Sequence, residues 1–260
     1  MIETGSWMDL IFLALMTILT NYYLKKAADG TLPNLRTIPA IAAIQEGVGK
    51  SIEENKPVHY AMGASGGQLY STLVSMTLTS FAFLKYLSSL CARLGARLIV
   101  HMPYQTESLP MIEEMVREGY RVEGKEEEFR VEDLRYYGRG ALTWTQGVTA
   151  SYAQEGVGLN LSIGIFYSDC PISLEMAKIM GGLNVGGTGR WIMVYAFAMM
   201  CDYVFLGEEI YAAAAIVSQN PTMLAGIWVE ELGKFFSIAM SIIGVILALV
   251  GLNIAPILGI

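Results

Sequence analysis

The chain has 260 residues, of which 53% are hydrophobic and 16% charged, and its formal net charge at pH 7 is −7. Soluble proteins average about 25% charged residues, so the low charged fraction favours segments that face lipid. The negative charge and the lack of a Lys/Arg cluster argue against a nucleic-acid partner.

The first apolar run extends from Trp7 to Leu24 and includes the polar residues Thr17 and Asn21. Acidic residues precede this run and two lysines follow it, which is the reverse of a secretory signal peptide. We therefore predict a transmembrane helix over residues 7–24, preceded by a short outer N-terminus, residues 1–6. Thr17 and Asn21 would give this helix a polar face for packing against another helix.

The stretch Glu46–Ser51, "EGVGKS", is similar to the end of a phosphate-binding loop. However, Ile44 stands where the first glycine of G-x-x-x-x-G-K-[ST] belongs. The neighbouring apolar residues recur at helical spacing, at positions 41, 44, 48 and 52. The pattern predicts an amphipathic helix, and we interpret Lys50 as a surface cation.

The middle of the chain alternates short apolar strands with helices of ten or more residues. Such alternation indicates a mostly parallel sheet covered on both faces. We predict an α/β fold, with a Rossmann-like domain over residues 27–232 flanked by two transmembrane helices. The predicted strands are residues 58–62, 97–101, 134–137, 159–166, 183–185 and 203–206.

Three separated blocks also carry a family resemblance: "IPAIAAIQEGVGKSIEENKPVHY", "LCARLGARLIV" with its downstream "EEMVREGY", and "CDYVFLGEEIYAAAA". In this order they resemble a family of uncharacterised archaeal and bacterial membrane proteins, grouped as a domain of unknown function. The resemblance covers roughly residues 36–240. It implies a membrane-tethered domain and supplies no reaction and no catalytic residue.

Two glycine-rich loops follow predicted strands and lead into helices. Ligands of open α/β sheets bind outside the carboxyl ends of the strands, where helix N-termini attract anions. A plain turn is the alternative for each loop, and helix capping is the alternative for Glu208. The candidate ligand-binding residues are Gly63, Ser65, Gly66, Gly67, Gly186, Gly187, Thr188, Gly189, Arg190 and Glu208.

Two further residues have side chains suited to catalysis. His101 ends a strand and Cys170 follows one, but the sequence assigns neither a partner. The three cysteines are widely separated and there are only two histidines, which disfavours both a disulfide framework and a His/Cys metal site. We predict no catalytic residue and no metal site, and the cofactor stays unknown.

A second apolar run, residues 235–254, contains no charged residue, so we predict a second transmembrane helix followed by an outer tail, residues 255–260. Lysines flank both runs on the side of the central domain, which predicts a cytoplasmic domain and outward termini in the cell membrane. Small residues on one stripe of this helix predict close packing: Ser237, Ser241, Gly244, Ala248 and Gly251.

These features favour a membrane-anchored homo-oligomer whose cytoplasmic Rossmann-like domain supports assembly or binds a small ligand, with no assigned reaction. The alternative is an enzyme or sensor that binds an anionic metabolite or nucleotide at the glycine loops. The expected partners are membrane lipid, further copies of the chain and other membrane proteins.

Overall fold

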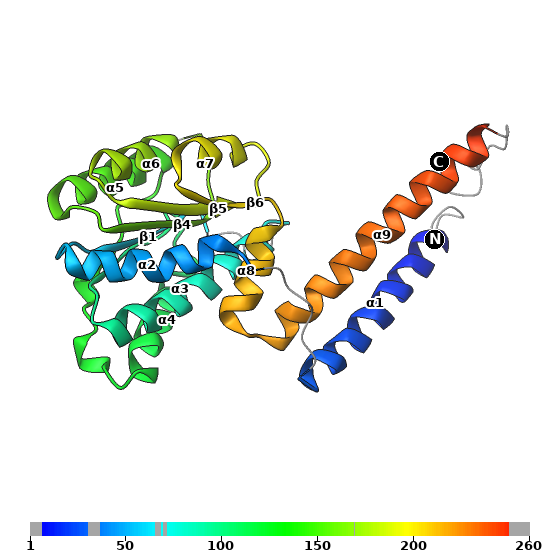
Figure 1. Ribbon diagram of the computed structural model, residues 1–260, viewed down its shortest axis with the longest axis horizontal. Helices are drawn as coiled ribbons and strands as arrows, with labels where there is room; N and C mark the ends of the chain where they lie inside the picture. The colour runs from blue at the N-terminus through cyan, green and yellow to red at the C-terminus, as the bar shows by residue number, and fades with distance from the viewer. Residues whose placement is uncertain (1–6, 31–36, 66–68, 70–71, 169, 250–260) are drawn as a thin grey trace. The chain divides into compact units, whose positions relative to one another are not determined.

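The computed structural model describes residues 7–30, 37–65, 69, 72–168 and 170–249, and the chain divides into two compact units. Unit 1 combines residues 1–35 and 219–260, and unit 2 comprises residues 36–218. Figure 1 labels the helices α1 (Trp7–Ala28), α2 (Pro39–Glu53), α3 (Val74–Leu94), α4 (Leu109–Val122), α5 (Ala141–Glu155), α6 (Cys170–Ile179), α7 (Val194–Met200), α8 (Glu209–Ser218) and α9 (Pro221–Leu249). The strands are β1 (Val58–Gly63), β2 (Leu98–His101), β3 (Leu134–Arg135), β4 (Leu159–Ile165), β5 (Leu183–Thr188) and β6 (Tyr203–Leu206).

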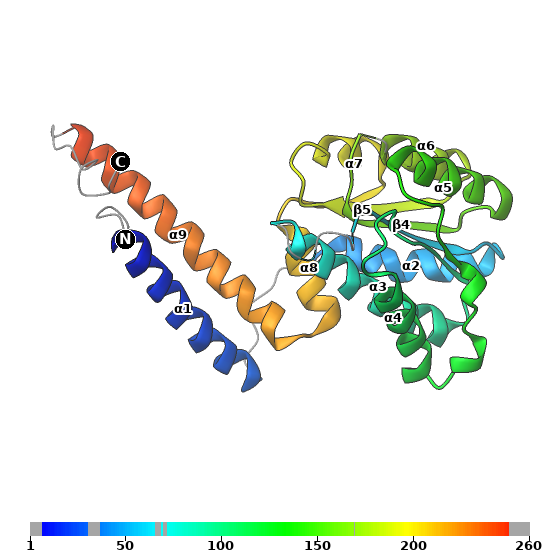
Figure 2. The same ribbon diagram turned by 180° about the vertical axis from the view of Figure 1, so that it is seen from behind.

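Unit 2 contains one six-stranded sheet in the order β3-β2-β1-β4-β5-β6, and every neighbouring pair is parallel. Helices α5, α6 and α7 cover one face, and α2, α3, α4 and α8 lie on the other (Figures 1 and 2). This is the doubly wound order, with the switch between β1 and β4. The predicted α/β fold with a parallel sheet is therefore confirmed.

The "EGVGKS" stretch lies within α2, as its helical spacing predicts. Pro39 occupies the first turn, where its missing N–H costs no hydrogen bond. The buried face includes Ala40, Ile44 and Val48, and Lys50 is paired with Glu54. The lysine is therefore a surface cation of an ordinary amphipathic helix.

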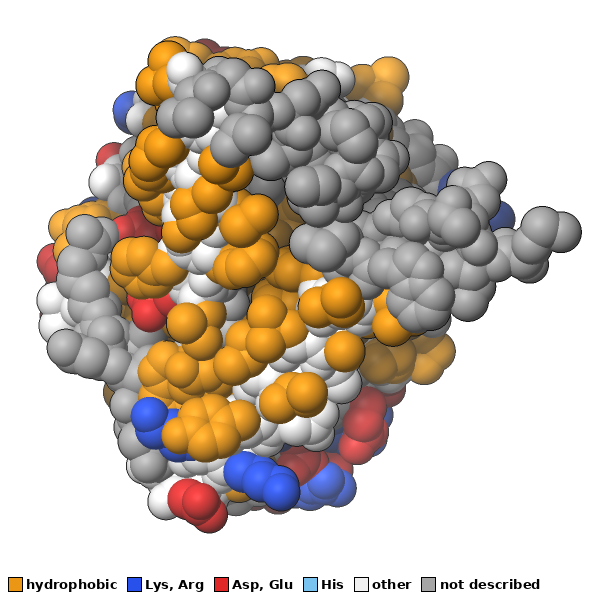
Figure 3. Space-filling model, turned by 90° about the vertical axis from the view of Figure 1, so that its right-hand side faces the viewer, with side chains coloured by type: hydrophobic (Ala, Val, Ile, Leu, Met, Phe, Trp, Pro, Cys, Tyr) orange, Lys and Arg blue, Asp and Glu red, His pale blue; other side chains and the backbone are white. Residues whose placement is uncertain are grey.

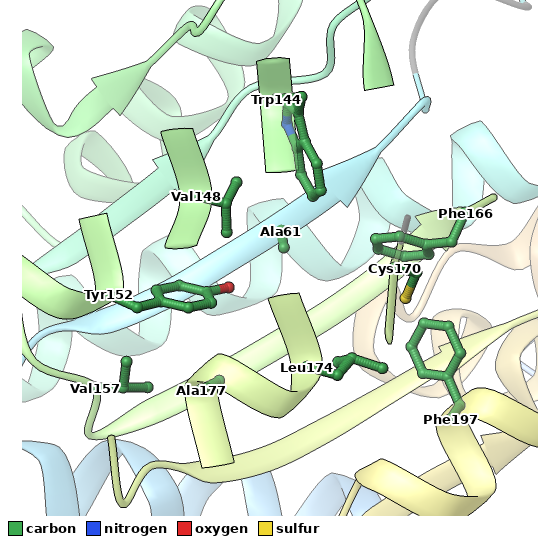
Figure 4. Close-up of a cluster of buried hydrophobic side chains, with 10 residues drawn as sticks. All are labelled: Ala61, Trp144, Val148, Tyr152, Val157, Phe166, Cys170, Leu174, Ala177 and Phe197. Atoms are coloured by element: carbon green, nitrogen blue, oxygen red, sulfur yellow. The ribbon is translucent and has the colours of Figure 1, made fainter. Parts of the chain in front are cut away.

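The core under α5, α6 and α7 is built from large apolar side chains of these helices and of the sheet. Trp144, Tyr152 and Phe197 are fully buried in it, and Cys170 lies between Phe166 and Phe197 (Figure 4). Burial also raises the pKa of the Cys201 thiol to about 12. Neither cysteine therefore offers an exposed thiolate.

A row of buried polar side chains crosses the same face of the sheet. His59, Asn160 and Asn184 stand opposite one another on β1, β4 and β5. The Tyr152 hydroxyl donates to Asn160 Oδ1 at 2.9 Å, and Asn160 Nδ2 donates to Asn184 Oδ1 at 2.9 Å. Asn184 Nδ2 then donates to the carbonyl of Leu174 at 3.1 Å. His59 bonds His101 and the Gly156 carbonyl instead. Since each of these buried polar side chains has a hydrogen-bond partner, the row can stay buried, and it fixes which residues pair.

The described part of unit 1 is an antiparallel pair of helices, α1 and α9, which are separated in the sequence by unit 2. The rings of Phe12 and Phe236 lie 5.6 Å apart, and those of Tyr23 and Trp228 lie 5.3 Å apart. Lys26 Nζ lies 5.0 Å from the Trp228 ring centroid, a cation–π contact. These contacts hold α1 along α9.

The two predicted transmembrane helices, residues 7–24 and 235–254, are wrong. Across the described part of the chain, no helix combines the length and the apolarity that crossing a membrane requires. Helix α1 includes Asn21 and ends in two lysines. In α9, charged residues occur up to Lys234, and the described uncharged part, residues 235–249, is shorter than the roughly 20 residues that a span needs. The predicted two-span arrangement, outward termini and cell-membrane location depended on these helices and are not supported.

Two glycines at positive φ allow a direct test of the junction between β1 and β4. A Cβ on Gly63 (φ +59°) would lie 2.3 Å from the carbonyl oxygen of Ile165, whereas a Cβ on Gly95 (φ +79°) would meet nothing within 4 Å. We expect Gly95→Ala to lower the free energy of unfolding by about 1 kcal/mol, the cost of the left-handed backbone. Gly63→Ala should lower it by about 2 kcal/mol more, because the added methyl group overpacks the junction. Urea unfolding of both variants measures this, and equal losses would contradict the close approach.

Candidate functional site

The switch point between β1 and β4 is closed by hydrogen bonds at the carboxyl edge of the sheet. The Ala64 N–H donates to the Ile165 carbonyl at 2.7 Å, and the Ile165 N–H donates to Ser65 Oγ at 2.9 Å. The register shifts just before this point, and Gly164 adopts φ +148° there. Such bulges re-aim side chains at the end of a strand. The predicted residues Gly63 and Ser65 therefore hold the edge together.

A group of aromatic side chains covers this edge, and we call it the edge cluster. Its centre is the buried trio Ala64, Met76 and Ile165, against which half-buried tyrosines pack. Arg190 lies over one of them, with Cζ 4.2 Å from the ring centroid of Tyr167. The tyrosines of the edge cluster are Tyr104, Tyr167 and Tyr211.

Arg190 is held in place through its backbone. Its N–H donates to Thr188 Oγ1 at 3.2 Å, and its carbonyl accepts from the Met193 N–H at 2.9 Å. Among the described residues, no carboxylate forms an ion pair with its guanidinium, which is half-buried. The group can therefore present its N–H donors to an anion.

The other predicted ligand-binding residues are distributed around this edge. Gly189 follows β5 and packs against Tyr211, because a Cβ on this glycine would lie 2.5 Å from the Tyr211 hydroxyl. Glu208 directly precedes α8, and its carbonyl accepts from the Tyr211 N–H. Gly66 and Gly67 lie outside the described residues.

Gly186 and Gly187 lie inside β5, although the predicted strand ends at residue 185 and is followed by a predicted loop that contains both glycines. A Cβ on Gly186 would lie 2.8 Å from the Phe197 ring, and one on Gly187 would lie 2.7 Å from Phe205 Cβ. These glycines make room for aromatic side chains on the two faces of the sheet. Glycines after an apolar strand are typical of a loop. Here they belong to the strand, because the aromatic rings packed against it leave no room for a side chain.

Sequence reasoning missed the three tyrosines. Tyr167 directly follows the predicted strand 159–166, and Tyr104 follows the strand that ends at His101. Aromatic residues just beyond parallel strands would have been a usable signal, because all these strands end at the same edge. Tyr211 gave no such signal, since it comes from α8.

A second arrangement concerns both histidines of the chain. His101 Nε2 lies 2.9 Å from His59 Nδ1, His59 Nε2 lies 2.8 Å from the Gly156 carbonyl oxygen, and both rings are fully buried. His101 Nδ1 lies 2.9 Å from the hydroxyl of Tyr137. The Tyr152 ring packs edge-on against both imidazoles. His101, which the sequence left without a partner, therefore has two.

The Gly156 carbonyl determines which ring nitrogens of the two histidines carry protons. The Gly156 carbonyl can only accept, so His59 Nε2 donates, and the Nδ1 of a neutral His59 must accept. His101 then donates from Nε2 and accepts the Tyr137 hydroxyl proton at Nδ1. Burial lowers the pKa of His59 to about 4, and burial with the neighbouring His59 and Arg135 lowers that of His101 well below its ordinary value. Two neutral, buried imidazoles form a structural link and leave no exposed base.

A hollow of about 400 Å³ opens at the amino edge of the sheet, between α4 and the start of β2 and β3. Arg97 lines it and donates to both carboxylate oxygens of Asp133, at 3.1 and 2.7 Å. Arg97 also donates to Glu155 at 2.9 Å. Since this guanidinium is already paired, we interpret the hollow as part of the framework and place the candidate ligand site at the carboxyl edge.

The histidine pair predicts the acid stability of the fold. The unfolded chain takes up a proton at His59 below its ordinary pKa of 6.5, whereas the folded chain does so only near 4, so stability falls as the pH falls through this window. We expect the free energy of unfolding to drop by about 3 kcal/mol between pH 6.5 and pH 4 from His59 alone.

Urea unfolding at half-unit pH steps measures this drop. Hydrogen bonds to Lys56 and Arg135 lower the pKa values of Glu54 and Glu155 from 4.5. These two carboxylates therefore change the free energy of unfolding mainly below pH 4.5, outside the window of the histidines. In the variant His59→Gln/His101→Gln, the free energy of unfolding should change little between pH 4.5 and pH 6.5. A flat wild-type profile would contradict neutral, buried imidazoles.

Comparison with known proteins gives one match. No curated protein and no solved structure is detectably similar to the chain. The membrane character and the archaeal or bacterial origin that the resemblance implied are not supported, whereas the predicted membership of a family defined by a domain of unknown function is confirmed. The family model described as "Domain of unknown function (DUF6754)" matches residues 1–257, so the chain belongs to the DUF6754 family.

Proposed function

We propose that unit 2 is a binding domain for a small anionic ligand, which sits at the carboxyl edge of the sheet beside Arg190. The observation that carries the proposal is the Arg190 guanidinium, half-buried on the Tyr167 ring at 4.2 Å. Ligands of doubly wound sheets bind at this edge, next to the switch point. A guanidinium that an aromatic ring and its own backbone hold in place loses little freedom on binding.

Binding is favoured over catalysis by the state of the reactive side chains. Both histidines are fully buried and bonded to each other, and Cys170 is enclosed in the core. An exposed nucleophile with an adjacent base would be needed for covalent catalysis. The proposed role is therefore that of a ligand-binding module.

Amide NMR of the full chain with sodium phosphate as the probe tests this function. Wild type should show saturable shifts for Thr188–Met193, measured against sodium chloride at equal ionic strength. Arg190→Gln should weaken phosphate binding about tenfold, which corresponds to about 1.4 kcal/mol for a charge-assisted hydrogen bond. Arg93→Gln, which removes an exposed charge from the far end of α3, should bind as wild type does. Shifts that do not saturate, or that survive Arg190→Gln, would refute the proposal.

We further propose that copies of the chain associate through unit 1. Many large apolar side chains of α1 and α9 are exposed, including Leu13 at 67% and Phe235 at 70%. Exposed apolar surface of this extent is typical of protein interfaces. One donor of each polar side chain already bonds a carbonyl of its own helix, at Thr17, Asn21, Ser237 and Ser241.

The small-residue stripe of α9 is open in its described part. Ser237 and Ser241 are exposed, and a Cβ on Gly244 would meet nothing within 4 Å. The stripe is therefore not used against α1 at these positions, and a helix of another copy could approach it closely. The Ala248 side chain and Gly251 lie outside the described residues. Figure 3, which views the molecule from the right-hand side of Figure 1, shows hydrophobic side chains over much of the described surface.

Sedimentation of full-length variants tests association. Gly244→Leu should weaken self-association at least about tenfold, because the added side chain blocks close helix approach. Gly49→Leu in α2 is the matched control, since a Cβ there also meets nothing within 4 Å in a helix. A wild-type monomer at all concentrations, or equal effects of the two changes, would refute the proposed interface.

A further inference from the structure

We infer that the ligand at the carboxyl edge combines its anionic group with a planar ring, the anion bound by Arg190 and the ring by Trp191. This inference rests on the proposed anion site and names the class of molecule that would occupy it. Examples of the chemistry are aryl phosphates, aromatic carboxylates and nucleotides.

The first support is the exposure of Trp191. Its side chain is 83% exposed, the highest value among the described large hydrophobic residues of unit 2. Trp buries more apolar area than any other side chain when a partner covers it, and its face attracts rings and cations. A largely exposed indole is unfavourable in water, and contact with a ring of the ligand would offset that cost.

The second support is the fixed position of the segment that carries both side chains. The hydrogen bonds from Arg190 N–H to Thr188 and from Met193 N–H to Arg190 enclose Trp191 in one turn. Arg190 is the only charged residue between Gly189 and Met200 in the sequence, and exposed side chains that follow it in this segment are uncharged, including Ile192 and Tyr195. Arg190 and Trp191 are therefore suited to bind one molecule that has an anionic end and an apolar body.

The third support is the aromatic composition of the edge cluster itself. Tyr104, Tyr167 and Tyr211 are half-buried, and one face of the Tyr167 ring is taken by Arg190. Rings stacked on aromatic side chains gain binding energy largely independent of their substituents. A planar ring therefore suits this edge better than an aliphatic chain of equal size.

Two probes that differ only in the ring separate this inference from the proposed function. Phenyl phosphate and methyl phosphate present similar phosphate groups, and their affinities for the full chain are measured by isothermal titration calorimetry. We expect wild type to bind phenyl phosphate about tenfold more tightly than methyl phosphate. Trp191→Ala should remove that preference while leaving methyl phosphate binding unchanged, and Trp191→Phe should restore part of it.

The variants show whether a negative result contradicts the anion site at Arg190 or the ring subsite at Trp191. If neither probe binds, or if Arg190→Gln binds both as wild type does, the anion site itself is refuted. If both probes bind wild type equally, or if Trp191→Ala keeps the tenfold preference, the ring subsite is refuted and the anion site stands. Since Trp191 is exposed, its replacement should leave the thermal unfolding temperature within about 1 °C of wild type.

Discussion

The register of the central strands is the constraint on which the rest of unit 2 depends. His59, Asn160 and Asn184 stand opposite one another on β1, β4 and β5, and hydrogen bonds join the two asparagines to α5 and α6. A shift by one residue would turn these side chains to the other face and leave buried polar groups unpaired, at about 1–3 kcal/mol for each. The polar row therefore selects one pairing where apolar residues alone would tolerate several.

The position of the carboxyl edge follows from this register. With β1 and β4 fixed in place, their ends meet closely enough for Ala64 and Ser65 to bond Ile165. The closed junction supports Met76 and the tyrosines, and Arg190 lies on one of these rings. The Tyr167 ring beneath the Arg190 guanidinium, which forms no ion pair with any carboxylate in the described part of the chain, is an arrangement suited to recognition. The histidines lie under α5 instead, where they link β1, β2 and the Tyr137 segment.

The error on the transmembrane helices has an identifiable cause. A low charged fraction and uncharged runs favour lipid-facing helices, but in the structure α9 begins at Pro221 and carries charges as far as Lys234. The apolar run is thus the second part of a longer helix that packs along α1 through Phe236 and Trp228. An apolar run shows that a surface avoids water, and it does not show which neighbour covers that surface.

The sequence by itself determined the strands of unit 2 and its parallel α/β fold. Helical spacing located α2, short apolar runs located the six strands, and their alternation with helices indicated the parallel sheet, because these signals depend on neighbours within a few residues. The tertiary structure alone decided which distant side chains meet. His59 and His101 are 42 residues apart, and Arg190 and Tyr167 belong to different loops. Their partnerships depend on strand order and register, and these are set by packing over the whole domain rather than by local sequence.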